Sequence, residues 1–576
     1  MSEMILPGVY INVHPEGLIA PGQITISNLG VVGTAARGDI GVPVLLGSYD
    51  QAKKEFYEYD AWLNSSTNLP NPTALTLVRA LEQAFAFGAT TVYAVRVAGS
   101  SAAAATLTLK TKGGKTVPLK AGKVVNGQLV DQPGTWGNHL SVDVDVLALK
   151  GQHPFINGEI VQLTGPNAFT LQRPVDTTSA RNIVTISNNG VVTTLQMVKT
   201  PPGPGKVQVT PNRKLNFHGP KPASPAMVTA SYAANVDAQQ VTIHFDTATE
   251  VYAVADAADL VSQLLAQSAW VTGPVKPPPP VEPLLPIPSV APEPFKGGND
   301  GVVGPVDYQP GLDALLTVDA HIIVAAGQDD RFGPALERHC ALASTDVIKR
   351  DRIAIVGSRM IDPAHPDNPL QANIDKFFDG LIGHSLASDR LIFVAPGMRA
   401  MDATAAEEVT LPGTYSAAAL AGLISSFDPE VSPTNKTLDV DSLEVVFDTA
   451  HLTEMVLNRI LALESRTGFR VVKGITTDTG AFRQITTRRI VDYAKYGVRA
   501  AAEPYIGLLN DERVRGALRA TINSFLTDMV NAEMLEGYDL DVSATRDEEI
   551  QGIARVTMSL QPVFSIDFIV VDMFLG

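Results

Sequence analysis

Alternation of apolar and polar side chains is clearest from Arg555 to Phe574. The apolar side of this two-residue period holds Val556, Met558, Leu560, Phe564, Ile566, Phe568 and Val570. The pattern predicts an extended strand pair or one long bent strand. Pro562 interrupts it and marks an edge or a bend, because proline cannot donate to a sheet ladder. A long apolar strand of this kind needs a specific partner to cover it.

A second short strand is predicted near the other end of the sequence. Val9, Ile11 and Val13 alternate with Tyr10 and Asn12, between turn-forming Pro and Gly residues. Both terminal segments can therefore enter a sheet. The pattern leaves two arrangements open: the two segments pair within one domain, or they complete the sheet of another subunit.

Strand and helix signals alternate from Gln23 to Val97. One helix is predicted from Leu77, Leu81, Ala84 and Phe85, which recur at helical spacing, and Gly88 follows where a left-handed cap is needed. The next segment, TTVYAVRV, is a nearly continuous β-branched and aromatic run that is typical of a central strand. This order of elements predicts a mixed sheet backed by helices.

The same alternation resumes after Gly297. The apolar segments HIIVAAG, RIAIVG and RLIFVAPG are predicted strands, and helical segments such as GPALERHCALASTDVIK and YSAAALAGLISS lie between or after them. Such an order is typical of a largely parallel sheet.

The middle of the chain differs in composition. Residues 99–272 are rich in Thr, Val, Gly, Asn and Gln and contain short alternating runs, which predicts an inserted β-rich domain with one helix, AADLVSQLLAQ. Residues 273–296 are rich in proline and favour an extended polyproline segment. A semi-rigid tether is the favoured use of this segment, and a ligand for a proline-binding module is the alternative.

Composition limits the possible functions. A chain of 576 residues is expected to form three or four domains, and 45% hydrophobic with 18% charged residues is typical of a folded protein. The net charge of −16 argues against binding to a phosphate backbone, so no nucleic-acid partner is expected. The lone Cys340 fits a reducing compartment. Neither a signal peptide nor a run long enough for a membrane span is recognised, so no direct membrane insertion is expected.

Two short motifs suggest ligand binding but lack essential residues. Gly113–Thr116 reads GGKT, yet a phosphate-binding loop needs a glycine where Leu109 stands, and a hairpin turn is the better interpretation. Asp539, Asp541 and Ser543 have the opening spacing of a calcium loop, but no glutamate occupies its twelfth position. An acidic loop explains them better, so no metal and no cofactor are expected.

An enzyme site is also weakly supported. Asp329, His339, His384 and Ser385 could in principle form a hydrolase constellation. The chain has no GxSxG elbow around a nucleophile, and isolated histidines in helical segments are usually structural. We therefore expect no catalytic residues.

A long helix is predicted from Asp511 to Leu535, with Asn510 as its N-cap. Its apolar stripe consists of Val514, Leu518, Ile522, Phe525 and Met529. Arg515 and Arg519 lie one turn apart outside this stripe. They form either a solvated charged flank or a contact surface for a partner.

Three segments resemble the tail sheath proteins of contractile phage tails and related injection particles. They are PGVYINV near the start, SPTNKTL at Ser432–Leu438, and TTRRIVDYAKYGVRAAAEPYIG at Thr486–Gly507. The resemblance covers about residues 1–98 and 300–576. The region between them matches nothing recognised, and in this family the outward-facing insertions vary most.

The resemblance implies an α/β and α+β multi-domain fold with a subtilisin-like α/β middle domain that lacks a protease triad. The implied division is 1–20 (N-terminal arm), 21–98 (first part of the core), 99–272 (outer β-rich domain), 273–296 (linker), 297–440 (middle domain) and 441–576 (C-terminal domain with a β-arm). The terminal strands, at Val9, Tyr10, Ile11 and Val13 and at Phe564, Ile566, Phe568 and Val570, would be arms exchanged between subunits.

The resemblance also implies partners and a function. The chain would polymerise with itself as stacked hexameric rings around an inner tail tube, bounded by baseplate and terminal cap proteins, and would contract to drive the tube through an envelope. Arg515 and Arg519 would face the tube. Such a particle, a phage tail or an injection device, assembles in the bacterial cytoplasm. The alternative that the parallel sheet alone permits is an α/β hydrolase-like enzyme with a β-rich accessory domain.

Overall fold

The computed structural model describes residues 26–574, except 127, 162–168, 189, 220, 223–225, 275–284 and 363–370. The chain forms two compact units, one from Met1–Ala98 with Val303–Gly576 and one from Gly99–Val302. The predicted strand with Val9, Tyr10, Ile11 and Val13 lies outside the described residues. Among the helices of the described ranges, none is long and apolar enough to cross a membrane.

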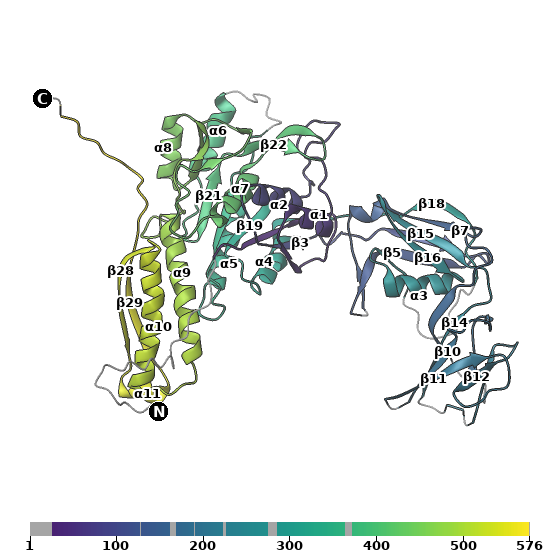
Figure 1. Ribbon diagram of the computed structural model, residues 1–576. Coiled ribbons are helices and arrows are strands. Elements are labelled where there is room, and N and C mark those ends of the chain that lie inside the picture. Colours follow the sequence, from purple (N-terminus) through teal and green to yellow (C-terminus); the bar gives the residue numbers. More distant parts are fainter. Residues whose placement is uncertain are drawn as a thin grey trace, which may run out of the picture. The chain divides into compact units, whose positions relative to one another are not determined.

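The first unit is built on a mixed sheet in the order β2-β3-β1-β19-β20-β21-β26-β27-β24 (Figure 1). Neighbouring strands from β3 to β26 run parallel, whereas β2, β27 and β24 pair antiparallel at the edges. The parallel sheet predicted after Gly297 is thus confirmed. Its strands are β1 (Leu29–Thr34), β2 (Pro43–Leu46), β3 (Val92–Val97), β19 (Ile322–Asp329), β20 (Ile353–Gly357), β21 (Leu391–Ala395), β24 (Thr437–Leu438), β26 (Leu461–Arg466) and β27 (Gly468–Val471).

Two groups of helices pack on this sheet. The first group contributes to one buried cluster with β19 and β20 and comprises α4 (Gln309–Leu315), α5 (Gly333–Ala343), α6 (Gln371–Ile382) and α8 (Thr449–Leu457). The second comprises α2 (Leu77–Ala86) and the almost wholly buried α7 (Gly413–Ser425), which contact each other and β19. An ideal Cβ on Gly422 would lie only 2.2 Å from the carbonyl oxygen of Ala84, so this close helix contact requires glycine.

Smaller elements complete this part of the unit. They are α1 (Tyr49–Phe56), the 3-10 turns η2 (Pro305–Tyr308) and η3 (Asp330–Phe332), and a small sheet, β23-β22-β25, of β22 (Met398–Asp402), β23 (Glu407–Leu411) and β25 (Ser442–Leu443).

The C-terminal part of the same unit is a helix pair with a two-stranded ribbon. Its elements are α9 (Ile485–Ala502), η4 (Glu503–Tyr505), α10 (Glu512–Asn531), β28 (Leu535–Ser543), α11 (Arg546–Gln551) and β29 (Arg555–Pro562). The predicted apolar stripe of α10 is confirmed, because Leu518, Ile522, Phe525 and Met529 are buried. The predicted cap is wrong by one residue. Asp511, rather than Asn510, accepts a hydrogen bond from the backbone N–H of Val514 (2.8 Å).

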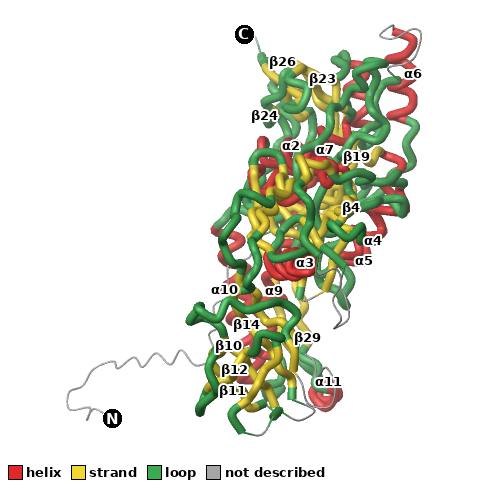
Figure 2. Tube along the Cα trace, turned by 90° about the vertical axis from the view of Figure 1, so that its right-hand side faces the viewer, coloured by secondary structure: helices red, strands yellow, loops and turns green. Residues whose placement is uncertain are grey.

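The second unit is β-rich. Its sheets run β8-β14-β10-β11-β12-β13-β9, β16-β15-β7-β18, and β17-β5-β4 with β6 beside β5. Its strands are β4 (Thr106–Lys110), β5 (Thr116–Val125), β6 (Gln128–Asp131), β7 (Leu140–Asp145), β8 (Phe155–Ile160), β9 (Phe169–Thr170), β10 (Ile183–Asn188), β11 (Val191–Val198), β12 (Lys206–Val209), β13 (Lys214–Phe217), β14 (Met227–Ala233), β15 (Gln239–Phe245), β16 (Ala248–Val254), β17 (Val271–Thr272) and β18 (Val290–Pro294). The predicted helix is α3 (Ala257–Gln267), and a 3-10 turn, η1 (Thr135–His139), precedes β7. Figure 2 shows these strands in yellow.

Three expectations are settled by these strands. The GGKT segment forms the predicted hairpin turn between the antiparallel strands β4 and β5. Residues 290–294, expected to belong to the proline-rich linker, instead form β18 on the edge strand position beside β7, where Pro294 is tolerated. Asp539, Asp541 and Ser543 lie on the exposed side of β28 and not in an acidic loop, because the intervening Tyr538, Leu540 and Val542 pack toward α10.

Candidate assembly surface

The helix pair α9–α10 gives the C-terminal part its own core. Phe525 of α10 packs over Gly497 of α9, where an ideal Cβ would lie 1.8 Å from the ring. Around this contact lie buried side chains of both helices, including Ile490, Ala494, Ile522 and Leu526. The Phe525 ring can therefore lie directly on the backbone of α9 only because residue 497 has no Cβ.

The ribbon of β28 and β29 covers α10 on one side. Leu540 and Val542 of β28 and Val556 and Leu560 of β29 pack against the helix-pair core. The other side of the ribbon is polar and exposed. In the described part of the chain neither strand pairs with a third, so both outer edges offer unpaired backbone N–H and C=O groups. A two-stranded ribbon of this kind gains stability when further strands join it.

The segment after β29 is extended but forms no strand. The predicted strand from Val563 to Val571 is therefore absent from the described chain, since no partner strand lies beside it. Its beginning is fixed to the body of the unit. The N–H of Val563 donates to the carbonyl oxygen of Met534 (3.1 Å), and the side chain of Gln484 bonds both the N–H (3.3 Å) and the C=O (3.4 Å) of Ser565.

An ion pair holds the next residues. Lys473 Nζ lies 3.0 Å from the carboxylate of Asp567, with both side chains largely buried, and 4.8 Å from the ring centre of Phe568. The Gln484 side chain also donates to Asp567 (3.1 Å). Polar side chains of the segment therefore face the unit, and its apolar side chains face outward.

Beyond these contacts the segment leaves the body of the unit (Figure 1). Its large apolar side chains have between 62% and 92% of their area exposed, at Phe564, Ile566, Phe568, Ile569, Val570, Val571, Met573 and Phe574. This set includes the four predicted arm residues of this end. Exposed apolar runs of this extent mark an interaction surface.

The two predicted tube-facing arginines differ in their surroundings. The Arg515 guanidinium donates to Asn510 (3.0 Å) and to Glu549 of α11 (3.0 Å), and only 14% of its side chain is exposed. Arg515 therefore does not project freely, because it is enclosed by α11 and by the turn that precedes α10. Arg519 is exposed.

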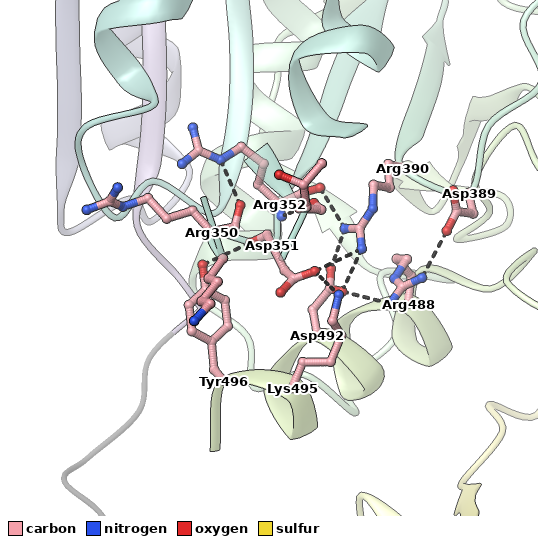
Figure 3. A network of polar contacts seen from close by, with 12 residues as sticks. Arg350, Asp351, Arg352, Asp389, Arg390, Arg488, Asp492, Lys495 and Tyr496 are labelled. Atoms are coloured by element: carbon pink, nitrogen blue, oxygen red, sulfur yellow. Dashed lines mark hydrogen bonds and ion pairs between the residues drawn. The ribbon is translucent and has the colours of Figure 1, made fainter. Parts of the chain in front are cut away.

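Sequence patterns did not reveal a buried charge network that joins α9 to the sheet (Figure 3). Asp492 of α9 accepts two hydrogen bonds from Arg390, at 2.9 and 3.1 Å, and one from Arg488 at 2.7 Å. Arg488 also donates to Asp389 (2.9 Å). Only 6% of the Asp492 side chain is exposed, so the charges are stabilised by pairing with one another and not by solvation.

A second carboxylate extends the network. Asp351 accepts from Arg390 (3.2 Å) and is also paired with Lys495 and Arg499, further along the same side of α9. Burial alone would raise the pKa of Asp351, but the bonds from Lys495 and Arg499 hold it below its usual value. For Arg390, burial would lower the pKa, and the charge of Asp492 outweighs this and raises it. Asp351 and Arg390 are thus both charged at neutral pH.

A repeated dipeptide could have revealed this network. An Asp-Arg pair precedes each of two neighbouring strands: Asp351-Arg352 before β20 and Asp389-Arg390 before β21. Parallel strands begin at the same edge of a sheet, so the repeat predicts a charged cluster at that edge. The matching charges on α9, such as Arg488 and Asp492, are four residues apart.

The residues considered for a hydrolase have structural contacts. His339 lies 3.1 Å from Arg352, and burial lowers its pKa to about 3. His384 contacts the carbonyl oxygen of Asn458 (2.6 Å), and Asp329 is paired with Arg331. Within the described ranges, no group of three His, Cys, Asp or Glu side chains is placed to hold a metal.

Comparison with solved structures identifies the class of fold. The chain is similar to a sheath tail protein of Desulfitobacterium hafniense, with 13% identity over 96% of this chain and 100% of that one and a TM-score of 0.55. A sheath tail protein of Listeria innocua gives 13% identity, 95% and 94% coverage and a TM-score of 0.57. The mixed multi-sheet architecture is thus that of the sheath tail proteins.

A family model matches the C-terminal part of the chain. Residues 477–576, which include α9, α10, the ribbon and the outward segment, match the model of the phage tail sheath C-terminal domain. Together with the shared fold, this match confirms the resemblance of the chain to the tail sheath proteins of contractile particles. No curated protein sequence matches the chain.

Proposed function

We propose that this protein is the structural subunit of a contractile sheath, which polymerises as stacked hexameric rings around an inner tail tube. The observation that carries the proposal is the exposed apolar segment 563–574 together with a ribbon whose two edges are open among the described residues, both inside the region that matches the sheath domain. The segment is an extended chain that needs a sheet edge, and the ribbon is a small sheet whose edges can accept a strand.

In the proposed assembly, the outward segment of one subunit adds to the ribbon of a neighbour, and the N-terminal segment with Val9, Tyr10, Ile11 and Val13 adds to the same sheet. Each main-chain hydrogen bond contributes about 0.5 to 1.5 kcal/mol, and each large apolar side chain that becomes buried contributes about 1.5 to 3 kcal/mol. Phe564, Ile566, Phe568 and Val570 are the side chains so buried. Main-chain pairing of this kind tolerates rotation of the domains that it joins.

Contraction then needs no active site. Subunits rotate as rigid bodies from an extended, metastable array to a compact one that buries more surface, and the free energy is stored during assembly. The buried pair of Asp492 with Arg390 supports this, because it fixes α9 to the sheet so that both turn together. The middle domain, subtilisin-like by family resemblance, serves as a scaffold without catalysis.

The proposed partners are other copies of the chain, the tube protein, and baseplate and terminal cap proteins, in a phage tail or an injection particle assembled in the bacterial cytoplasm. The Gly99–Val302 unit is proposed to decorate the outside. Neither a nucleotide nor a metal takes part.

Deleting residues 562–576 tests the proposal. The truncated chain should stay folded and soluble but form no tubes, because α9, α10 and most of the ribbon remain while the exchanged strand is lost. Negative-stain electron microscopy of the intact chain should show striated tubes, and a melting curve should show that the truncated chain is folded. As a matched control, Asp572→Asn alters the same segment without removing an apolar side chain and should leave tubes intact. Unfolding of the truncated monomer would mean that the segment belongs to its own chain, and compact intact monomers with hydrolytic turnover would favour an enzyme.

A further inference from the structure

A cavity of about 510 Å³ lies within the Gly99–Val302 unit. Loops from different sheets converge on it: the β4–β5 turn supplies Lys112, the loop after β7 supplies Leu147 and Lys150, and the β12–β13 turn supplies Arg213. This volume is within the range of pockets that hold small molecules. The cavity is separate from the assembly surface described above, since all its lining residues belong to the second unit.

The floor of the cavity is an ion-paired cluster in which Arg173 meets two carboxylates. Arg173 donates to both oxygens of Asp256, at 2.6 and 2.7 Å, and approaches Glu159 at 3.4 Å. Asp256 also caps α3 by accepting from the N–H groups of Ala258 and Asp259, both at 3.0 Å. The side chains of this floor hold one another in place, so a ligand meets a preformed surface.

The rim of the cavity is cationic, and among the described residues its lysines lack the carboxylate partners that Arg173 has in the floor. In the part of the unit that the structure describes, the ammonium groups of Lys112 and Lys150 have no carboxylate partner, and Arg213 donates to the carbonyl oxygen of Gln172. The remaining lining carboxylate, Asp237, accepts from the N–H of Gly151 (3.0 Å). Apart from the paired Arg173 and Asp256, the described lining therefore holds three cations and one acid.

This local excess stands against the composition of the whole chain, which has 60 acidic and 44 basic residues. Elsewhere in the same unit, Lys120 is paired with Asp131. The walls add apolar contacts from Leu147, Pro174 and Pro286, and none of the described lining residues has an aromatic ring on which a base could stack.

We propose that this cavity binds an oxyanion, a phosphate or carboxylate group on a compact body, with Lys112, Lys150 and Arg213 as the binding residues. Lysine supplies a point charge and arginine a directional fork, which together suit a tetrahedral or planar oxyanion. The anion is either free in solution or carried by an anionic polymer. The site does not depend on the proposed sheath function.

Binding of inorganic phosphate to the full chain, followed by isothermal titration calorimetry at low salt, tests the site. Wild type should show saturable binding that weakens with added salt. Lys112→Glu combined with Lys150→Glu should bind phosphate at least about tenfold more weakly, because two attractive charges become repulsive. The matched control is Lys206→Glu, an exposed lysine on β12 outside the cavity, which should bind as wild type does.

A second titration uses poly(glycerol phosphate). Binding of the polymer at least about tenfold tighter per site than that of phosphate, with competition between the two, would assign the site to a polymer-borne anion, and equal affinity would assign it to the free anion. Melting curves of all variants establish that they are folded. Absence of saturable binding of both probes, or equal binding by wild type and the double variant, would overturn the proposal.

Discussion

Gly497 of α9 and the ring of Phe525 of α10 occupy space that cannot hold one more methyl group. An ideal Cβ at position 497 would lie 1.8 Å from Cζ of Phe525. We expect Gly497→Ala to lower the free energy of unfolding of the C-terminal part by about 1 to 3 kcal/mol, because the helices must separate or the ring must leave its rotamer. Chemical denaturation monitored through the C-terminal helices gives this value.

Gly516 of α10 provides the matched control. It is also helical, but a Cβ there would meet nothing within 4 Å. Gly516→Ala should therefore stabilise the helix, by about 0.5 to 1 kcal/mol, since alanine has less freedom to lose on folding. Equal effects of the two substitutions would show that the Gly497 contact does not limit the helix pair.

The second prediction concerns Asp492. Asp492→Asn leaves Arg390 and Arg488 buried with too little negative charge, and the cost of breaking such a buried pair is about 3 to 5 kcal/mol. Amide hydrogen exchange along α9 should become faster. Asp50→Asn removes an exposed carboxylate from a pair with Lys53 at 3.4 Å, and it should change stability by no more than about 1 kcal/mol. Unchanged exchange in α9 of Asp492→Asn would contradict its role in fixing the helix.

The third prediction is a pH dependence from Glu444. Burial raises the pKa of this carboxyl to about 7, although the N–H groups of Ile361 (2.7 Å) and Gly397 (3.0 Å) donate to it. The folded state therefore takes up a proton more readily than the unfolded state. Its contribution to stability is full below about pH 4.5 and is lost as the pH rises through 7. The melting temperature should fall between pH 5.5 and 8, by an amount that corresponds to about 1 to 3 kcal/mol.

Glu444→Gln should reduce this pH dependence, because the amide has no proton to release. Glu444 and Glu408 line one cavity of the first unit, and Glu408 pairs with Arg399 at 3.0 Å. Glu408→Gln, which changes an exposed carboxylate, is the control, and its melting temperature should depend on pH as that of wild type does. If the melting temperature of Glu444→Gln falls with pH as steeply as that of wild type, Glu444 is not the source of the pH dependence.

The fourth prediction separates the two arginines of α10. Arg519→Glu, at an exposed position, should leave the fold intact but reduce the yield of extended, tube-filled particles, most strongly at low salt where surface charges act further. Arg515→Glu should instead destabilise the C-terminal part, because it places a second carboxylate beside Glu549. Electron microscopy and melting curves distinguish the outcomes. Normal yields of extended particles from Arg519→Glu at low ionic strength would exclude it from the tube contact.

The fifth prediction concerns the inserted unit. Its two ends lie side by side, since an ideal Cβ on Gly99 would be 2.1 Å from the carbonyl oxygen of Val302. Replacing residues 100–301 by a short Gly-Ser linker should therefore preserve the first unit and tube formation. Insoluble protein would indicate that the first unit needs the insertion to fold.

The sequence predicts elements well where one period governs them. The parallel strands β19, β20 and β21 and the helix α3 follow directly from apolar runs and helical spacing. Local pattern is insufficient where the partner is far away. Asp492 and Arg390 are about a hundred residues apart, and their pairing depends on the sheet that brings them together.

The outward segment shows a second limit of sequence patterns. Alternation describes a strand, but a strand forms only beside another, and none stands next to Phe564 or Ile566 in the described chain. Similarly, Arg515 and Arg519 lie on the same face of a helical wheel. They differ in the structure because Asn510 and Glu549 meet only the former.

The register of the ribbon determines how it carries tension. Pro562, the last residue before the outward segment, pairs with Leu535, the first residue of β28 after α10, so both lie at the same end of the ribbon. A pull on the segment away from α10 opens such a ribbon one residue pair at a time, as a zipper opens, and does not load all its hydrogen bonds together. Before the force reaches Pro562, it must pass Asp567 and Ser565, which Lys473 and Gln484 hold. The Lys473–Asp567 and Gln484–Ser565 contacts thus bear the force before the ribbon does.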